Sequence, residues 1–168
     1  MKAHHFAVMT AALLGTVLFA ACSTTQGSRE TEALKMSLRG VCMKQMQEIA
    51  AAMLEYREKN GTLPKKPSDL KGYITARSYD GDRLSWQIFI SPVERIEVDR
   101  EMDPWAFADA NTSYTFHSDA DLENWRDILL SEKKPFLWPD KKIHVAVGGH
   151  AMLLTDAELK KYLENGKL

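Results

Sequence analysis

The sequence predicts an α+β fold, with a long N-terminal helix packed on an antiparallel sheet and a short helix at the C-terminus. Residues 30–60 carry apolar side chains at helical spacing. Residues 142–154 form two apolar runs separated by a Gly-Gly pair, a pattern typical of a β-hairpin. Residues 155–163 begin with the capping box Thr-Asp-Ala-Glu and continue with an amphipathic pattern, which indicates a helix.

The long helix should bury one stripe of side chains against a core. Asn60-Gly61 should end it, because glycine readily adopts the left-handed conformation that closes many helices, and Pro64 prevents its continuation. At 100° per residue, the apolar positions that share the stripe are Leu34, Leu38, Val41, Cys42, Ile49, Ala52, Met53 and Tyr56.

A second apolar ridge lies nearly opposite this stripe and consists of Met36, Met43, Ala50 and Leu54. A helix packed on a single sheet should be polar on that side. The ridge therefore has two explanations. Either it meets a partner helix or another protomer, or loops of the chain itself cover it.

The middle of the chain predicts short elements between turns. We expect a helical turn over Ser68–Ile74, a turn at Asp80-Gly81, and strands over 86–90, 94–98, 113–117 and 128–130, with an irregular polar stretch over 99–112. Gly148-Gly149 should form a two-residue hairpin loop with positive φ. That register places Ile143, Val145, Val147, Met152 and Leu154 on one face.

The first 21 residues are expected to be a signal peptide. Lys2 precedes an uncharged, mostly apolar run from Phe6 to Ala21, which is shorter than the ~20 residues of a membrane span. Its end, Leu18-Phe-Ala-Ala-Cys22-Ser23, resembles the lipobox of bacterial lipoproteins. The resemblance implies that Cys22 is lipidated and becomes the mature N-terminus. A plain signal-peptidase cut after Ala21 is the alternative.

Three segments follow from this interpretation: signal peptide 1–21, lipidated tether 22–29 and domain 30–168. The polar residues after Cys22 should be a short flexible tether. We expect a location in the cell envelope, in the outer membrane rather than the inner. An Asp directly after the lipidated cysteine resembles an inner-membrane retention signal, and Ser23 stands at that position instead. Acyl chains contribute ~0.8 kcal/mol per buried methylene.

Composition excludes several classes of function. Charged residues make up 27% of the chain but the net charge is only −1, which argues against nucleic acid as a partner. Of the two cysteines, Cys22 is consumed by acylation, so no disulfide framework is expected and Cys42 should be a lone buried thiol.

No catalytic motif is recognisable, so we expect no enzyme and no cofactor. In the hairpin register above, His144 and His150 point to opposite faces, as partly exposed strand residues. Asp119, Asp121 and Glu123 supply oxygen ligands for calcium, or form a solvated acidic turn; Asn124 stands where an EF-hand would have Gly. Trp105, Trp125 and Trp138 either line a binding surface or pack internally.

Several short motifs of the sequence resemble those of the pilin-like proteins of type II secretion, in particular the prepilin-type group with the C-terminal signature His-X9-Asp-Gly. Cys42-Met-Lys-Gln-Met46 resembles that group's Cys-x-x-Asn-Leu, and Asn60-Gly-Thr-Leu-Pro64 its Asn-Gly and Pro. Phe89-Ile-Ser-Pro92 resembles Phe-x-Cys-Pro, with Ser91 in place of the cysteine. Val145–His150 resembles the closing strand, although Gly148 and Trp138 replace the signature Asp and His.

The resemblance implies a pilin-like domain, but no prepilin processing, because the Gly-Phe-Thr-Leu-Ile-Glu cleavage site is missing. Asp103-Pro-Trp105 is also similar to the Asp-Pro-Trp of calcium-binding major pseudopilins. We therefore expect a lipid-anchored envelope protein that acts without catalysis in assembly or interaction, in a secretion or pilus-like system. The alternative is an envelope module that binds a cation or another ligand.

Overall fold

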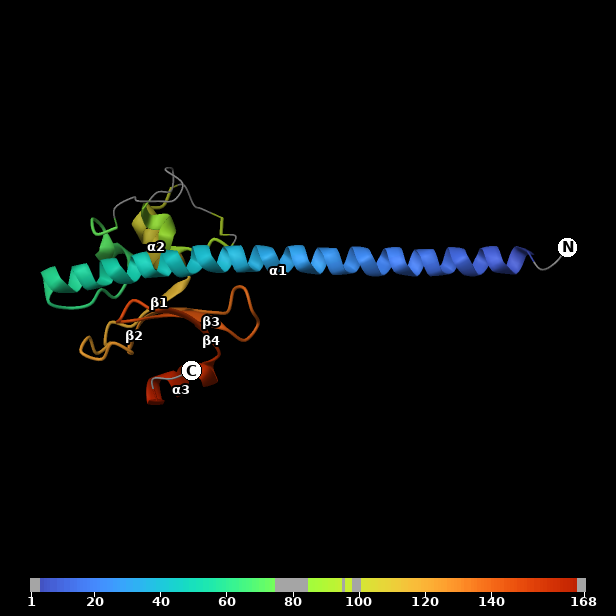
Figure 1. Ribbon diagram of the computed structural model, residues 1–168. Helices are drawn as coiled ribbons and strands as arrows, with labels where there is room; N and C mark the ends of the chain where they lie inside the picture. Colours follow the sequence, from blue (N-terminus) through green and yellow to red (C-terminus); the bar gives the residue numbers. More distant parts are fainter. Residues whose placement is uncertain (1–3, 75–84, 95, 98–100, 166–168) are drawn as a thin grey trace. The chain divides into compact units, whose positions relative to one another are not determined.

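The computed structural model describes residues 4–74, 85–94, 96–97 and 101–165, with side chains from Thr31 onward (Figure 1). The chain forms two units, Met1–Ser37 and Leu38–Leu168. Helix α1 (His4–Asn60) is followed by η1 (Pro67–Leu70), η2 (Ser85–Phe89), α2 (Pro104–Asn111), β1 (Tyr114–Phe116), β2 (Ile128–Glu132), β3 (Lys142–Ala146), β4 (Ala151–Leu154) and α3 (Asp156–Asn165). A long helix, a four-stranded antiparallel sheet and a C-terminal helix confirm the predicted α+β fold.

Helix α1 is longer than the sequence suggested. It begins at His4 and continues through residues 22–29, where we expected a flexible tether. No proline occurs between His4 and Asn60 to interrupt it. Its end is as predicted, because Gly61 has φ of 79° and its N–H donates to the carbonyl oxygen of Arg57 at 2.8 Å.

The C-terminal half of α1 is covered on two sides within the unit Leu38–Leu168. The α2 region and the sheet lie on opposite sides of it (Figure 1). Toward η2, Gln45 Nε2 donates to the carbonyl oxygens of Ile88 at 2.6 Å and Ile90 at 3.1 Å. Toward the sheet, Gln47 Nε2 donates to the carbonyl oxygen of Gly149 at 2.9 Å. The helix residues buried in the resulting core are Cys42, Gln45, Met46, Ile49, Ala50, Ala52 and Met53.

The sheet has the strand order β1-β2-β3-β4 and is covered on both faces. Leu130, Ile143 and Val145 belong to the core that contains α1. A second apolar cluster on the α3 side contains Ile128, Ala146, Leu154 and Tyr162. A register shift between Ile128 and Leu130 marks an irregularity in β2.

The β3–β4 hairpin differs from the predicted one by one residue. Val145 pairs with Ala151 and His144 with Met152, so the loop has three residues, 147–149. The Gly149 N–H donates to the carbonyl oxygen of Ala146 at 2.8 Å, and Gly149 has φ of 80°, whereas Gly148 has no positive φ. A one-residue slip moves side chains to the other face. Met152 and Leu154 therefore contact the α3 cluster and not the face of Ile143 and Val145.

Of the other elements predicted for the middle of the chain, some are confirmed and some are wrong. The strands at 113–117 and 128–130 are present as β1 and β2, and the helical turn after Pro67 as η1. The strand at 86–90 is wrong, because this segment is the 3₁₀-helix η2. The segment 94–98 forms no strand where it is described, and Asp80-Gly81 lies outside the described residues.

The predicted irregular stretch at 99–112 contains α2. Asp103 caps this helix, its Oδ1 accepting from the N–H groups of Trp105 and Ala106, both at 3.0 Å, and Pro104 is its first residue. The capping box of α3 is confirmed. Thr155 N–H donates to Glu158 Oε2 at 2.8 Å, and Glu158 N–H donates to Thr155 Oγ1 at 3.1 Å.

Two exposed glycines, Gly149 in the hairpin loop and Gly40 in α1, should respond to alanine in opposite ways because their backbone conformations differ. Gly149→Ala should reduce the free energy of unfolding by about 1–2 kcal/mol, because alanine at positive φ is strained, and Gly149→Asn should cost less. Gly40→Ala in α1, where the added methyl meets open space, should raise it by about 1 kcal/mol. Urea denaturation of the three variants measures this. Equal tolerance of alanine and asparagine at position 149 would contradict the assigned loop.

Candidate functional site

The predicted lipidation site, Cys22, lies in a part of α1 whose side chains are outside the described residues. Cys22 is helical in its backbone, and its acylation stays a prediction. Across the described residues, no helix is both long enough and apolar enough to span a bilayer.

The chain itself covers most of the second ridge of α1. Ala50 is 2% exposed, and Met43 and Leu54 are partly buried against the main core. Met36 differs, because its side chain is 57% exposed. The core of the domain thus accounts for three of the four ridge positions, and a partner is not needed to explain them.

The acidic loop after β1 uses its carboxylates to hold turns. Asp121 Oδ1 accepts from the N–H of Glu123 at 3.0 Å, and the Asp121 N–H donates to Asp127 Oδ2 at 2.7 Å. Asp119, Asp121 and Glu123 are all exposed. Within the described ranges, no three His, Cys, Asp or Glu side chains are grouped so that they could hold a metal ion. Calcium binding at this loop stays a prediction.

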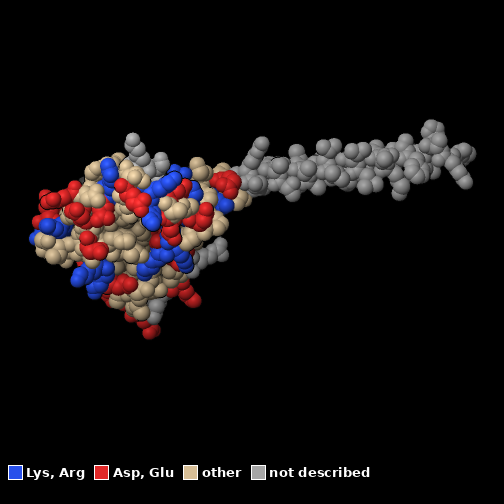
Figure 2. Space-filling model, turned by 90° about the horizontal axis from the view of Figure 1, so that it is seen from below, with Lys and Arg blue, Asp and Glu red and all other residues tan. Residues whose placement is uncertain are grey.

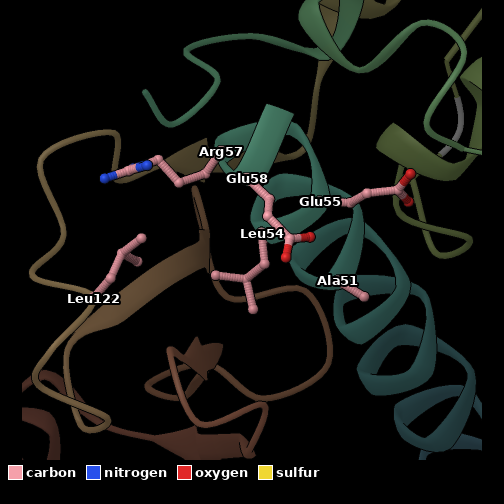
Figure 3. A pocket seen from close by; sticks show the side chains of 6 residues that line it. All are labelled: Ala51, Leu54, Glu55, Arg57, Glu58 and Leu122. Atoms are coloured by element: carbon pink, nitrogen blue, oxygen red, sulfur yellow. The ribbon is translucent and has the colours of Figure 1, made fainter. Parts of the chain in front are cut away.

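A shallow hollow joins the ridge to the acidic loop. Its volume is about 570 Å³, and Figure 3 shows Leu54 of α1 and Leu122 of the acidic loop on two sides of it. These two positions are far apart in the sequence, and no local pattern predicts their meeting. The complete lining is Ala51, Leu54, Glu55, Arg57, Glu58 and Leu122.

The charged residues of the hollow are exposed and differ in their partners. Glu55 Oε1 pairs with Lys59 Nζ at 2.7 Å on the outer surface of α1. Arg57 extends toward the loop that carries Leu122, whereas Glu55 and Glu58 lie on the other side of Leu54 (Figure 3). Elsewhere on the domain, acidic and basic side chains are interspersed over the face in Figure 2, so that face presents no field of a single sign.

The structure corrects the expectation for the two histidines. His144 is 3% exposed and its Nδ1 lies 2.8 Å from Ser131 Oγ, which is also 3.0 Å from His117 Nε2. His150 is exposed and lies edge-on to Trp125, with ring centroids 6.2 Å apart. The three-residue loop removes the basis for placing His144 and His150 on opposite faces. Sequence reasoning missed this cluster, because its members lie on or beside three different strands.

The serine–histidine cluster is a buried cross-link. Burial lowers the pKa of His144 to about 4, with a smaller contribution from the positive charge of Lys142, so its imidazole is neutral at ordinary pH. Ser131 is 8% exposed, which leaves its hydroxyl little access to a substrate. The hydroxyl bridges two imidazoles and so ties β2 to β3 and to the residue after β1.

Glu132 is a second buried ionisable group. It is 4% exposed, and its Oε2 accepts from the Ile143 N–H at 2.8 Å. Its Oε1 has no hydrogen-bond partner among the described residues. Burial raises the pKa of Glu132 to about 7, and the Ile143 N–H opposes that shift.

The structure also places the predicted buried thiol and the three tryptophans that were candidates for a binding surface. Cys42 is buried, as expected, and its Sγ lies 4.0 Å from Ser91 Oγ. Trp105 is half-buried and packs on Phe89, while Trp138 is half-buried near Lys141. Trp125 is 50% exposed, with the Arg126 guanidinium 5.1 Å from its ring centroid. Internal packing therefore accounts for Trp105, and Trp125 lies on the surface.

The domain is thus an α+β unit in which one helix is enclosed between a four-stranded sheet and a short helical layer. Comparison with family models, curated proteins and solved structures finds no match.

The raised pKa of Glu132 predicts a pH-dependent stability. The neutral carboxyl contributes stability that is fully present below the unfolded value of 4.5 and is lost as pH rises through about 7. Glu132→Gln stays neutral, so its free energy of unfolding relative to the natural chain should increase by about 2–3 kcal/mol between pH 5 and pH 8.

Urea denaturation at both pH values measures this difference. The depressed pKa of His144 acts in the opposite sense, since its contribution is present above 6.5 and lost as pH falls through about 4. That contribution is common to both chains and cancels. A difference that does not change with pH would show that Glu132 titrates normally.

Proposed function

We propose that this chain is a lipid-anchored protein of the cell envelope that binds other proteins and has no catalytic role. The observation that carries the proposal is the leader that ends in Leu18-Phe-Ala-Ala-Cys22-Ser23. Acyl chains on Cys22 would hold the domain at a membrane, because anchoring by two or three chains is effectively stable. We place the anchor in the outer membrane, because Ser23 follows the cysteine.

The geometry favours interaction over catalysis. Ser131 and His144, which have the residue types of a nucleophile and a base, are buried in the sheet. The carboxylate of Asp121 accepts a hydrogen bond from the Glu123 N–H within its own loop. The surface features that remain are the hollow beside Leu54 and exposed apolar side chains such as Trp125. Such features suit contact with another protein.

The resemblance to pilin-like proteins of type II secretion names the kind of assembly we propose. Its motifs have cysteines at the positions of Cys42 and Ser91, which are 49 residues apart in the sequence. The 4.0 Å contact between the Cys42 thiol and the Ser91 hydroxyl supports this alignment, because two cysteines there would be close enough to pair after small side-chain rotations.

The alternative is an envelope module that binds a cation or another ligand through the loop of Asp119, Asp121 and Glu123. This alternative has less support, because within the described ranges these side chains are not grouped so that three of them could hold one ion. The protein-binding proposal is therefore preferred.

Acylation predicts a defined mature N-terminus. Intact mass spectrometry of the chain purified from bacterial membranes should show a protein that begins at Cys22 and carries two or three fatty acids. Cys22→Ala should lose the fatty acids and leave the detergent-extracted membrane fraction. Cys42→Ala is the matched control and should keep both. A native protein without fatty acid would refute the anchoring.

The Cys42–Ser91 contact predicts an engineered disulfide. Ser91→Cys should form a bond to Cys42 under oxidising conditions and raise the free energy of unfolding by up to about 4 kcal/mol for a loop of this length. Thiol titration under denaturing conditions detects the bond. Ser131→Cys, a buried serine on the other face of the sheet, is the control and should leave Cys42 free. A free thiol at position 42 in oxidised Ser91→Cys would contradict the packing.

A further inference from the structure

The last strand of the sheet, β4, has a single neighbouring strand, β3, among the described residues. Two hydrogen bonds at the end of β3 show in which direction the backbone groups point. The Val147 N–H donates to the Asp127 carbonyl oxygen at 2.8 Å, away from β4, whereas the Ala146 N–H donates to the His150 carbonyl oxygen at 3.1 Å. Because backbone groups alternate in direction along a strand, the even-numbered residues of β3 and β4 bond to each other.

Ala151 and Leu153 of β4 therefore point their N–H and C=O groups outward from the sheet. They lie opposite Val145 and Ile143, and the Ile143 N–H is directed away from them to Glu132 Oε2. Within the described part of the chain, the backbone groups of Ala151 and Leu153 have no hydrogen-bond partner. Both residues are partly exposed, so β4 offers a row of accessible donors and acceptors.

The common devices that block a sheet edge are missing from β4. Such edges are protected by short strands, charged side chains, proline or a bulge. The sequence of β4 is Ala-Met-Leu-Leu, without charge or proline, and its register with β3 is regular. The opposite edge differs, because β1 has only three residues and the Tyr114 N–H already donates to Thr112 Oγ1 at 3.2 Å.

We propose that β4 pairs with β4 of a second copy of this chain, in antiparallel order, with the two-fold axis at Met152. In this register Ala151 of each copy lies opposite Leu153 of the other, and each outward N–H meets an outward C=O. A two-fold contact requires a surface that is complementary to itself, and this edge meets that requirement. The inference goes beyond the proposed function and does not depend on acylation of Cys22.

The side chains across the axis are compatible with this pairing. Like charges directly opposite each other destabilise a strand pair. Here His150 of one copy lies opposite Leu154 of the other, and the residues between them are apolar. Paired residues share a face of the sheet. Ala151 and Leu153, which both pack on the core that contains α1, would therefore meet on one face, and Met152 would meet its own copy on the α3 face.

Cysteine cross-linking of the full chain in a non-ionic detergent tests this register. The background is Cys22→Ala, so that buried Cys42 is the only other thiol. Met152→Cys should give a disulfide-linked dimer under mild oxidation, because the two residues on the axis form a non-hydrogen-bonded pair with Cα atoms about 4.5 Å apart.

Leu153→Cys is the matched control, because it lies on the same strand but off the axis. Its two copies would be diagonal neighbours about 7–8 Å apart, too far for a disulfide. Non-reducing electrophoresis should therefore show at least about fivefold more dimer for Met152→Cys than for Leu153→Cys.

A proline separates backbone pairing from side-chain contact. Leu153→Pro removes one outward N–H and leaves the bonds between β3 and β4 in place. Added to Met152→Cys, it should reduce the dimer at least about fivefold. Leu153→Ala keeps the N–H and should change the dimer less than about twofold. Circular dichroism checks that each variant is folded.

Three results would overturn the proposal: no dimer with Met152→Cys, equal dimer with Leu153→Cys, or an unchanged dimer when a folded Leu153→Pro is added. If Leu153→Pro does not fold, the two cysteine variants decide the question by themselves. None of these chains is acylated, so the pairing of β4 and the lipid anchor can fail separately.

Discussion

The burial of the α1 segment from Cys42 to Met53 on two sides is the constraint on which the rest of the domain depends. Met46, Ile49 and Met53 have no exposed surface. Because the sheet and the η2–α2 layer each pack on this helix, neither has a complete core without it. Gln45 shows how tightly the two layers are joined, since a polar side chain only 5% exposed bonds α1 to the backbone at Ile88 and Ile90.

The same arrangement determines which chemistry reaches the surface. His144, with its neutral imidazole, and Glu132, whose pKa is raised to about 7, are buried inside the domain on opposite faces of neighbouring strands. Each makes a hydrogen bond to a neighbouring strand instead of meeting solvent. The α1 residues that follow the buried segment emerge beside the acidic loop, where Leu54 and Leu122 form the floor of a hollow. The proposed role in protein interaction draws on these surface features and not on the buried polar groups.

Local signals in the sequence predicted the elements whose causes are local. The end of α1 at Gly61 and the capping box of Thr155 and Glu158 each depend on a few neighbouring residues, and both were predicted. The cap and proline at Asp103-Pro104 are an equally local signal for α2, whereas an irregular stretch was predicted there. The hairpin was predicted with a loop one residue too short, because Gly148-Gly149 fits two loop types and only the packing of Met152 and Leu154 on α3 selects one.

The functional surface was less predictable, because it depends on contacts between distant segments. Met43, Ala50 and Leu54 were recognised as an apolar ridge, but the core that buries them includes strands that begin 60 or more residues later in the chain, at β1. The cluster of His117, Ser131 and His144 has no periodic or motif signal, since its members come from β2, from β3 and from the residue after β1. The loop of Asp119, Asp121 and Glu123 was predicted to supply oxygen ligands, but nothing in the sequence indicated that Leu122 of this loop lines the same hollow as Leu54 of α1.

Hydrogen exchange in the native state tests the two-sided burial of α1 most directly. Our account predicts that the amides from Cys42 to Met53 exchange only through global unfolding, with the same free energy of opening as β2 and β3. Exchange of these amides with a clearly lower free energy of opening than the sheet would contradict it, because the helix would then leave the core while the sheet remained folded.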